Sequence, residues 1–127
     1  MTKPLTTFTD ARLGTLTILR DNLPAYTYGT KLPRTVTDPF VLIARDFSRT
    51  RYPVDERVTI RVTVYAADSA ASEQVAQLCR AYLLSTPGTA LIRATGSLTG
   101  PLDAVDPDTG AAMTSFTVAV HTRPVEV

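Results

Sequence analysis

The stretch Arg57–Leu84 constrains the fold more than any other part of this sequence. It opens with Arg57–Ala66, in which apolar side chains occupy every second position. That period is typical of a β-strand with one buried face. We expect the buried face to carry Val58, Ile60, Val62 and Val64. The opposite face then carries Arg57, Thr59, Arg61, Thr63 and Tyr65.

The second half of this stretch has helical spacing, beginning after Ala66-Ala67. Asp68 or Ser69 can cap the helix N-terminus, and Glu73 lies early, where the helix dipole favours negative charge. The helix is expected to end before Thr86-Pro87-Gly88, because proline cannot continue it. Its buried face is predicted to consist of Val75, Leu78, Cys79, Tyr82 and Leu83.

Length and charge narrow the class of protein. A chain of 127 residues suits one domain, residues 1–127, with a core of its own. A formal charge of +1 excludes the broad positive field of a general nucleic-acid binder. The single cysteine, Cys79, excludes an internal disulfide and is expected to be a small buried hydrophobe. No run approaches the roughly 20 apolar residues that span a bilayer, so we expect a soluble protein made in the cytoplasm, with no membrane partner.

The N-terminal third predicts one helix and two strands. Leucines spaced by three or four residues predict a helix over Phe8–Leu23, capped by Thr9 or Asp10. A strand is expected at Ala25–Tyr28. A second strand, Phe40–Ala44, is apolar throughout, which predicts cover on both faces. Either a neighbouring subunit or a long loop over a central strand would supply that cover.

Two polar stretches are predicted to be connections. Arg45–Glu56 alternates arginines with aromatic residues, a pattern that can hold phosphates and stack bases. Its three acids favour a solvated or subunit-contacting hairpin loop instead. After a short strand at Ala90–Thr95, Gly96–Ala112 is rich in glycine, proline and aspartate and is expected to be a long, turn-containing hairpin. Ser115–His121 then closes the sheet, with inward-facing Phe116, Val118 and Val120.

The candidate reactive sites do not assemble into chemistry. His121, the only histidine, falls on the face opposite the inward residues and is expected at a surface or interface. Asp106–Gly110 has its glycine one place too early for a calcium loop, and Thr117 stands where a bidentate glutamate is needed. We expect it to be an aspartate-stabilised turn. Gly96–Gly100 lacks the lysine of a phosphate-binding loop. No catalytic residue, metal site or cofactor is therefore expected, and the chain is not expected to be an enzyme.

The element order predicts an α+β fold: a mostly antiparallel sheet of four to five strands with two helices packed on one face. The other face would be available for assembly, and it carries Thr59, Arg61, Thr63, Tyr65, Thr117, Ala119 and His121. Long polar hairpins on such a domain are compatible with a ring, which repeats one head-to-tail contact.

Three stretches also carry a resemblance to a known family. They are the passage Arg57–Asp68 running into Glu73–Leu84, the hairpin Leu98–Pro101 with Val105–Gly110, and the strand Ser115–Arg123. In these stretches the chain resembles the tail terminator proteins of long-tailed (siphovirus-type) bacteriophages, particularly those of actinobacterial hosts. With the leading helix, the likeness covers most of the chain in order.

The resemblance implies a non-catalytic structural virion protein. It would form a homohexameric ring at the head-proximal end of the tail, end polymerisation of the tube and provide the attachment surface for the head connector. The implied partners are further copies of the chain, the tail tube protein and the head-tail connector protein. DNA would pass through the ring without specific recognition. Other phage neck, head-tail connector and tail-completion proteins have a similar fold, so these stations in the virion remain alternatives.

Two connections are predicted to make the contacts, Arg45–Arg57 and Leu98–Gly110, because loops on a rigid scaffold commonly do so. The candidate interface residues are Arg45, Arg49, Arg51, Tyr52, Arg61, Asp106 and Asp108. A competing class is a nucleic-acid-binding α+β module that uses Arg45, Arg49, Arg51, Arg57 and Arg61 with Tyr52, although near-neutral charge argues against it. A third is a small-molecule binding protein or enzyme subunit, which would need an apolar pocket with convergent polar groups.

Overall fold

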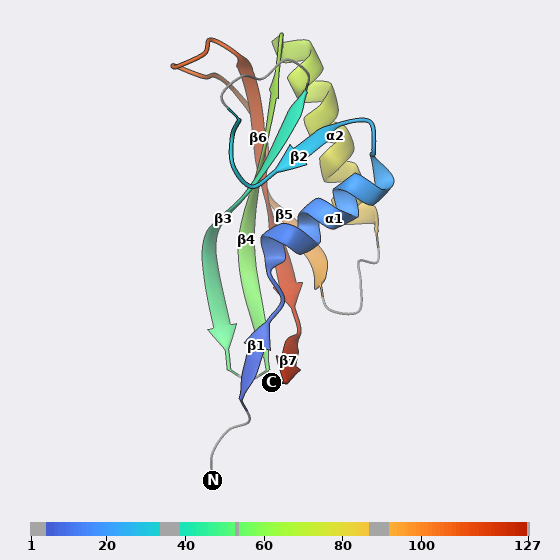
Figure 1. The fold of residues 1–127 in the computed structure, drawn as a ribbon, viewed down its shortest axis with the longest axis vertical. Helices are drawn as coiled ribbons and strands as arrows, with labels where there is room; N and C mark the ends of the chain where they lie inside the picture. The colour runs from blue at the N-terminus through green and yellow to red at the C-terminus, as the bar shows by residue number, and fades with distance from the viewer. Residues whose placement is uncertain (1–4, 34–38, 53, 87–91, 127) are drawn as a thin grey trace.

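Two helices cover one face of a five-stranded sheet in the computed structural model, which describes residues 5–33, 39–52, 54–86 and 92–126 (Figure 1). The strand order is β2-β3-β4-β6-β5, and a separate two-stranded sheet pairs β1 with β7. The elements in chain order are β1 (Thr6–Phe8), α1 (Ala11–Asn22), β2 (Thr27–Gly29), β3 (Phe40–Arg51), β4 (Asp55–Ala66), α2 (Ser69–Ser85), β5 (Ile92–Val105), β6 (Ala112–Thr122) and β7 (Pro124–Glu126).

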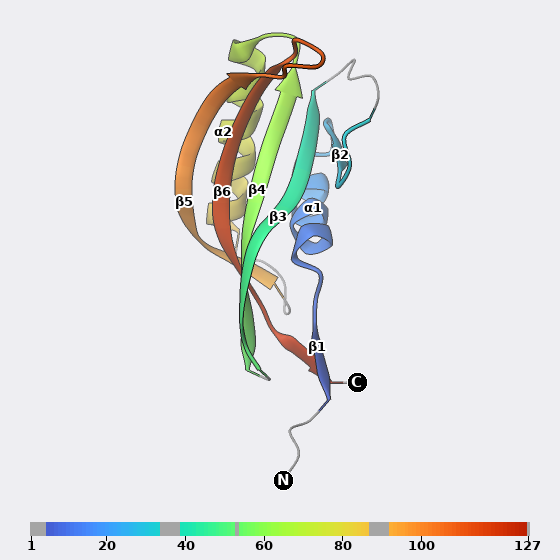
Figure 2. The ribbon, with the colours of Figure 1, turned by 90° about the vertical axis from the view of Figure 1, so that its left-hand side faces the viewer.

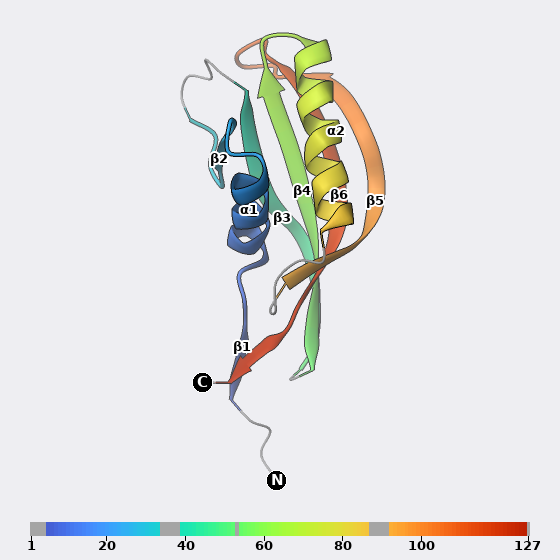
Figure 3. The same ribbon diagram turned by 90° about the vertical axis from the view of Figure 1, so that its right-hand side faces the viewer.

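The layering is the predicted one. Both helices lie on the same side of the sheet, as Figure 3 shows, and no helix of the described residues lies on the opposite side (Figure 2). We call these sides the helix-covered face and the open face. α2 lies across β4, β5 and β6, while α1 lies beside β2, β3 and α2. Every strand pair is antiparallel except β2 with β3. The prediction of an α+β fold with a mostly antiparallel sheet is confirmed.

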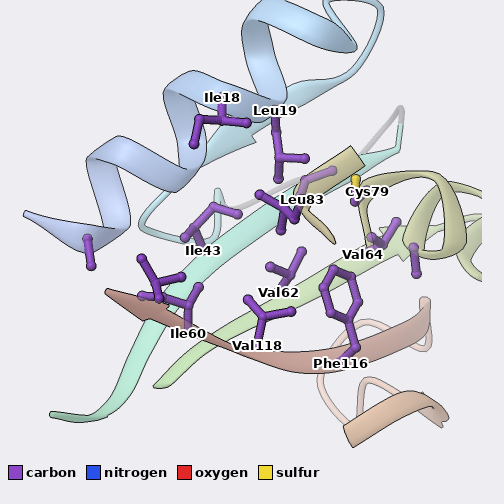
Figure 4. Packing of buried hydrophobic residues seen from close by; sticks show 14 of the residues in the cluster. Ile18, Leu19, Ile43, Ile60, Val62, Val64, Cys79, Leu83, Phe116 and Val118 are labelled. Atoms are coloured by element: carbon purple, nitrogen blue, oxygen red, sulfur yellow. The ribbon is translucent and has the colours of Figure 1, made fainter. Parts of the chain in front are cut away.

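The alternation in β4 sets the core. All four predicted inward side chains are fully buried, and the register places Val62 between Ile43 of β3 and Phe116 of β6. Side chains from both helices meet them from above (Figure 4). The largest fully buried apolar side chains of this core are Phe116, Leu19, Ile43, Ile60, Leu83, Val41, Val58, Val62, Val64, Val118 and Val120.

The boundaries of α2 follow its capping residues. Asp68 Oδ1 accepts a hydrogen bond from the backbone N–H of Ala71 at 2.8 Å, and the helix ends where the Thr86 N–H bonds to the Tyr82 carbonyl at 2.9 Å. Pro87 and Gly88, predicted to stop the helix, lie outside the described residues. The prediction that Leu78 and Tyr82 are buried is wrong, since both are more than one-third exposed. They flank a narrower buried stripe formed by Ser72, Val75, Ala76, Cys79 and Leu83.

The first helix begins later than predicted. Asp10 caps it by accepting hydrogen bonds from the backbone N–H groups of Arg12 at 2.9 Å and Leu13 at 3.4 Å. Phe8 belongs instead to β1, opposite Pro124 of β7. This pairing joins segments more than 100 residues apart, so no local pattern predicts it.

The prediction that Arg45–Glu56 is a connecting loop is wrong. β3 continues to Arg51 and β4 starts at Asp55, so the chain reverses over only a few residues, where the Val54 N–H bonds to the Arg51 carbonyl. A bulge at Asp46 shifts the register. Beyond it the β3 side chains are all exposed, so no apolar alternation marks the strand in the sequence.

The prediction of a long, turn-containing hairpin over Gly96–Ala112 is confirmed, since β5 and β6 pair as far as Val105 with Ala112 and a turn at Asp106–Gly110 joins them. β5 runs to Val105, and its pairing with β6 shifts at three places between Ala94 and Leu102. Glycine and proline are tolerated there because β5 is an edge strand with irregular pairing. The predicted strand start, Ala90-Leu91, lies outside the described residues. The prediction of an inward Phe116, Val118 and Val120 is confirmed.

Part of the open face is enclosed by the chain itself. Phe40 at the start of β3 is buried, and its ring lies so close to Gly29 of β2 that a Cβ on Gly29 would be 2.9 Å from the ring. The second cover predicted for this strand is thus supplied at Phe40 by β2. Thr63, Tyr65 and Ala119, expected on a free assembly face, are also buried.

Candidate functional site

The projecting end of the β3–β4 hairpin gathers positive charge on the open face. Arg49 of β3 lies directly opposite Arg57 of β4, and Arg57 lies opposite His121 of β6. With Arg51 and Asp55 these side chains line a hollow of about 300 Å³. Like charges facing each other across a strand pair destabilise a sheet. An anionic partner would relieve this repulsion. The structure thus brings two of the predicted interface residues, Arg49 and Arg51, together at a surface that favours such a partner.

One of these arginines is already neutralised. Arg51 donates two hydrogen bonds to Asp55, at 3.0 and 2.7 Å, and His121 Nδ1 lies 4.0 Å from Asp55 Oδ2. The hydrogen bond from Arg51 lowers the pKa of Asp55 and raises that of Arg51. Arg49 and Arg57 have no acidic side chain within ion-pair distance among the described residues. The net charge of the hollow comes from these two.

The other predicted arginines are placed elsewhere. Arg61 is bound to Asp46 at the bulge, with contacts of 3.0 and 2.7 Å, so its charge is compensated. Arg45 lies opposite Ile60, whose side chain is on the helix-covered face. The five arginines that sequence reasoning grouped for nucleic-acid binding thus do not form one surface.

Tyr52 has a structural contact instead of joining this cluster. Its hydroxyl accepts a hydrogen bond from the Thr6 N–H at 2.9 Å, and its ring meets Phe8 edge-on at 6.4 Å. It thereby ties the hairpin tip to β1. The aromatic residue exposed near the free arginines is Phe47, two positions before Arg49 on the same face and 64% exposed.

The opposite end of the sheet holds the second predicted contact region. Asp106 Oδ1 accepts a hydrogen bond from the Asp108 N–H, and its Oδ2 accepts one from the Thr109 hydroxyl, both at 3.0 Å. Gly110 completes the turn with a φ of +74°, which only glycine adopts readily. The predicted aspartate turn is confirmed. Asp106 is buried and shapes the turn, whereas Asp108 is exposed.

A polar chain fastens this end to the body. The Thr114 hydroxyl of β6 lies 2.8 Å from the Ser72 hydroxyl of α2 and donates to Asp103 Oδ1 of β5 at 2.9 Å. Both Ser72 and Thr114 are fully buried. Because buried hydroxyls need such partners, these hydrogen bonds fix the position of β5 against α2.

Exposed apolar side chains lie at both ends, and the sequence analysis did not name them among the candidate interface residues. At the hairpin tip they are Phe47 and Val54, and on β5 they are Leu102 and Val105, each at least 60% exposed. We define the β3–β4 patch as Phe47, Arg49, Val54 and Arg57, and the β5–β6 patch as Leu102, Asp103, Val105 and Asp108. In the sequence, these apolar residues are hidden among turn-forming and charged ones.

A third exposed surface follows the outer side of α2. It is an open groove of about 670 Å³ lined by Ala70, Glu73, Gln74, Gln77, Leu78 and Ala81. Its lining carries one charge and no convergent set of polar groups of the kind that orients a small ligand.

The described residues offer little for catalysis or metal binding. Within residues 5–33, 39–52, 54–86 and 92–126, no three histidine, cysteine, aspartate or glutamate side chains gather closely enough to hold a metal ion. In the same part of the chain, neither helix has the length and apolar character needed to cross a membrane. Cys79 is buried, and burial raises the pKa of its thiol to about 12, which is the opposite of activation.

Comparison with models of protein families and with curated protein sequences finds no match to this chain. Its function therefore has to be argued from the residues and their geometry.

Proposed function

We propose that this chain is a ring-forming structural protein of the tail-terminator type. It caps the tail tube of a long-tailed bacteriophage at the head-proximal end, ends tube polymerisation and offers an attachment surface to the head connector. The observation that carries the proposal is that two unlike exposed patches, the β3–β4 patch and the β5–β6 patch, lie at opposite edges and opposite ends of one sheet. Figures 1 and 2 show the two hairpins that carry them at opposite ends of the sheet.

Unlike patches favour a head-to-tail contact. A two-fold dimer brings the same surface of both copies together, whereas a head-to-tail contact joins two different surfaces and closes into a ring when the rotation allows. The second half of β3 and all of β5 have no further described strand at their outer edges. Each copy therefore presents one contact edge to each of two neighbours.

The β5 edge is suited to side-chain contacts and poorly suited to strand addition. Its pairing is irregular at three places, and Pro101 removes a backbone donor. Irregularities and prolines on edge strands block open-ended pairing with other chains. A contact of this kind supports a closed assembly of defined size.

The proposed partners follow from this role. They are five further copies of the chain in a hexamer, the tail tube protein on one side of the ring and the head connector protein on the other. DNA passes through the ring without specific recognition. The protein is made in the host cytoplasm and ends in the virion, and it needs no cofactor and performs no catalysis.

The first experiment is the solution mass by light scattering over a concentration series, without and with purified tail tubes. We expect a mass near six chains, or a monomer that assembles on tube ends and stops their growth, as seen in electron micrographs. Leu13→Ser, which changes an exposed leucine outside both patches, is expected to behave as the wild-type protein does in both measurements. A protein that remains monomeric and leaves tube length unchanged would contradict the proposal.

A nucleic-acid-binding module is the second candidate, and the free Arg49 and Arg57 are the observation that favours it. Phosphate contacts release counterions, so binding of this kind weakens steeply with salt. A DNA gel shift that disappears between low and physiological salt, and that is absent in Arg49→Glu/Arg57→Glu, would support it. It is the weaker proposal because Arg51 and Arg61 are paired with Asp55 and Asp46, Arg45 lies on the other face, and Tyr52 contacts β1.

A further inference from the structure

The two patches carry opposite charge. Five arginines and three acidic residues lie between Arg45 and Arg61, whereas the sequence from Ala94 to Thr122 contains three aspartates and no lysine or arginine. Asp68 and Glu73, at the start of α2, lie at the same end of the sheet as the three aspartates, because Ala66 pairs with Ala112. The net charge of +1 is thus unevenly distributed, with one end of the sheet basic and the other acidic.

Each patch combines its charge with exposed apolar side chains. Phe47 lies on the same face as Arg49 and Arg57, which have no acidic partner among the described residues, and Val54 lies in the turn of the same hairpin. On the edge strand β5, Val105 shares a face with Asp103, Leu102 lies on the other face, and Asp108 follows in the adjoining turn. An apolar centre with charges around it is the usual composition of a protein interface. A DNA backbone would pair with the arginines but would leave Phe47 and Val54 without an apolar partner.

One chain cannot bring its own two patches together. Glu56 lies opposite Thr122 and Ala66 lies opposite Ala112, so ten residues of β4 separate the two ends of the sheet. At about 3.3 Å per strand residue this is roughly 33 Å. The patches also lie on opposite edges, since β3 and β5 flank β4 and β6. Any contact between the two patches must therefore join two molecules.

We infer that the β3–β4 patch of one copy docks on the β5–β6 patch of a second copy, with Arg49 and Arg57 meeting the carboxylate of Asp108 beside an apolar contact. This inference rests on the proposed ring and names its subunit contact. Adjacent subunits are offset along their strands, because the patch at one end of the sheet meets the patch at the other end. Complementary charge of this kind fixes the register and excludes like pairs.

The test uses two full-length variants with opposite changes. Arg49→Glu/Arg57→Glu makes the first patch acidic, and Ala104→Lys/Asp108→Lys makes the second patch basic. Asp103 is left alone because it accepts a hydrogen bond from Thr114, whereas Ala104 and Asp108 are exposed. Each variant alone is expected to require a concentration at least ~10-fold higher to assemble than the wild-type protein, with an unchanged thermal unfolding midpoint.

A one-to-one mixture of the two variants is the decisive measurement. In an alternating ring every contact then joins a basic patch to an acidic one, so the mixture is expected to recover the wild-type mass. Arg20→Glu/Lys31→Glu is the matched control for Arg49→Glu/Arg57→Glu, because it changes the net charge by the same amount at exposed residues outside both patches and is expected to assemble normally.

The possible failures are distinguishable. If the wild-type protein forms no assembly with or without tubes, the proposed function fails. If the wild-type ring forms and both variants also assemble, or if the mixture does not recover the ring, the inferred contact is wrong while the ring stands. If Arg49→Glu/Arg57→Glu assembles normally but loses a salt-sensitive DNA gel shift, the β3–β4 patch binds nucleic acid, which also overturns the inference.

Discussion

The two halves of β3 pair with the same neighbouring strand but have opposite surroundings. In Phe40–Ala44 every side chain is buried or half-buried, with Val41 and Ile43 in the core, whereas in Arg45–Arg51 every side chain is exposed. The first half is held by apolar packing. The second half is held by backbone pairing with β4 and by exposed polar pairs such as Thr50 with Glu56 at 2.8 Å.

If the exposed half binds a neighbouring subunit as proposed, this difference separates stability from recognition along a single strand. Apolar burial is the main stabilising contribution in folding, so the buried half determines whether the domain exists. Exposed ion pairs contribute little to stability, so the exposed half is free to carry residues chosen for a partner. Substitutions in the two halves and in the elements packed on them should therefore have separable effects.

The largest expected effect compares two phenylalanines. Phe116→Ala should lower the free energy of unfolding by about 3–5 kcal/mol, because it removes a fully buried ring and leaves a cavity between β6 and α2. Phe47→Ala, the same substitution at a ring that is 64% exposed, should cost less than about 0.5 kcal/mol. Urea unfolding followed by circular dichroism measures both, and equal losses would break the comparison.

The next effect compares two threonines. Thr114→Val removes the buried hydroxyl that links Ser72 to Asp103, and we expect a loss of about 1–3 kcal/mol. The control is Thr50→Val, which removes an exposed hydrogen bond in the second half of β3 and favours strand structure. Its stability should be within about 0.5 kcal/mol of the wild-type protein. A loss at Thr50 as large as that at Thr114 would show that the exposed hairpin is held by its polar pairs.

The buried side of the comparison also predicts a pH effect. The pKa of the Cys79 thiol is raised by burial from 9.0 to about 12, so between these values the folded chain keeps a proton that the unfolded chain loses. The contribution of the neutral thiol to the free energy of unfolding is fully present well below pH 9 and is lost as the pH rises. At pH 10 the loss is about 1.4 kcal/mol. Cys79→Ala should flatten the fall between pH 8 and pH 10 in urea titrations. Equal pH dependence in both proteins would assign the fall to other groups.

The buried half of the molecule could be predicted from the sequence because its signals are local. Alternation in β4 and β6 and the capping aspartate of α2 each depend on residues within a few positions. The helical spacing also predicted too wide a buried face for α2, since Leu78 and Tyr82 have that spacing but lie beside the buried stripe. The width of that stripe depends on how the helix lies on the sheet, which the sequence of the helix does not contain.

The exposed half was predicted less well because its strands lack a buried face. Arg45–Arg51 and Gly96–Val105 are strands held by pairing with distant segments, and their residues are typical of loops. The candidate site was difficult to predict for the same reason. Which arginines are free depends on cross-strand neighbours, so the pairing of Arg61 with Asp46 could not be foreseen. The predicted contact region stays a prediction, but the structure shows which of its charges are compensated by neighbouring side chains.

The smallest effect on stability is expected to coincide with a large effect on assembly. Phe47→Ala removes the apolar centre of the β3–β4 patch, and truncation of an aromatic residue at the centre of an interface commonly weakens binding by roughly tenfold or more. Leu13→Ala is the control, since Leu13 is 55% exposed on α1 and belongs to neither patch. Light scattering over a concentration series should show later assembly for the first variant alone. If both variants assemble as the wild-type protein does, the exposed half of β3 is not a contact surface; if Phe47→Ala instead unfolds at lower urea, its ring stabilises the hairpin and the separation of stability from recognition fails at this residue.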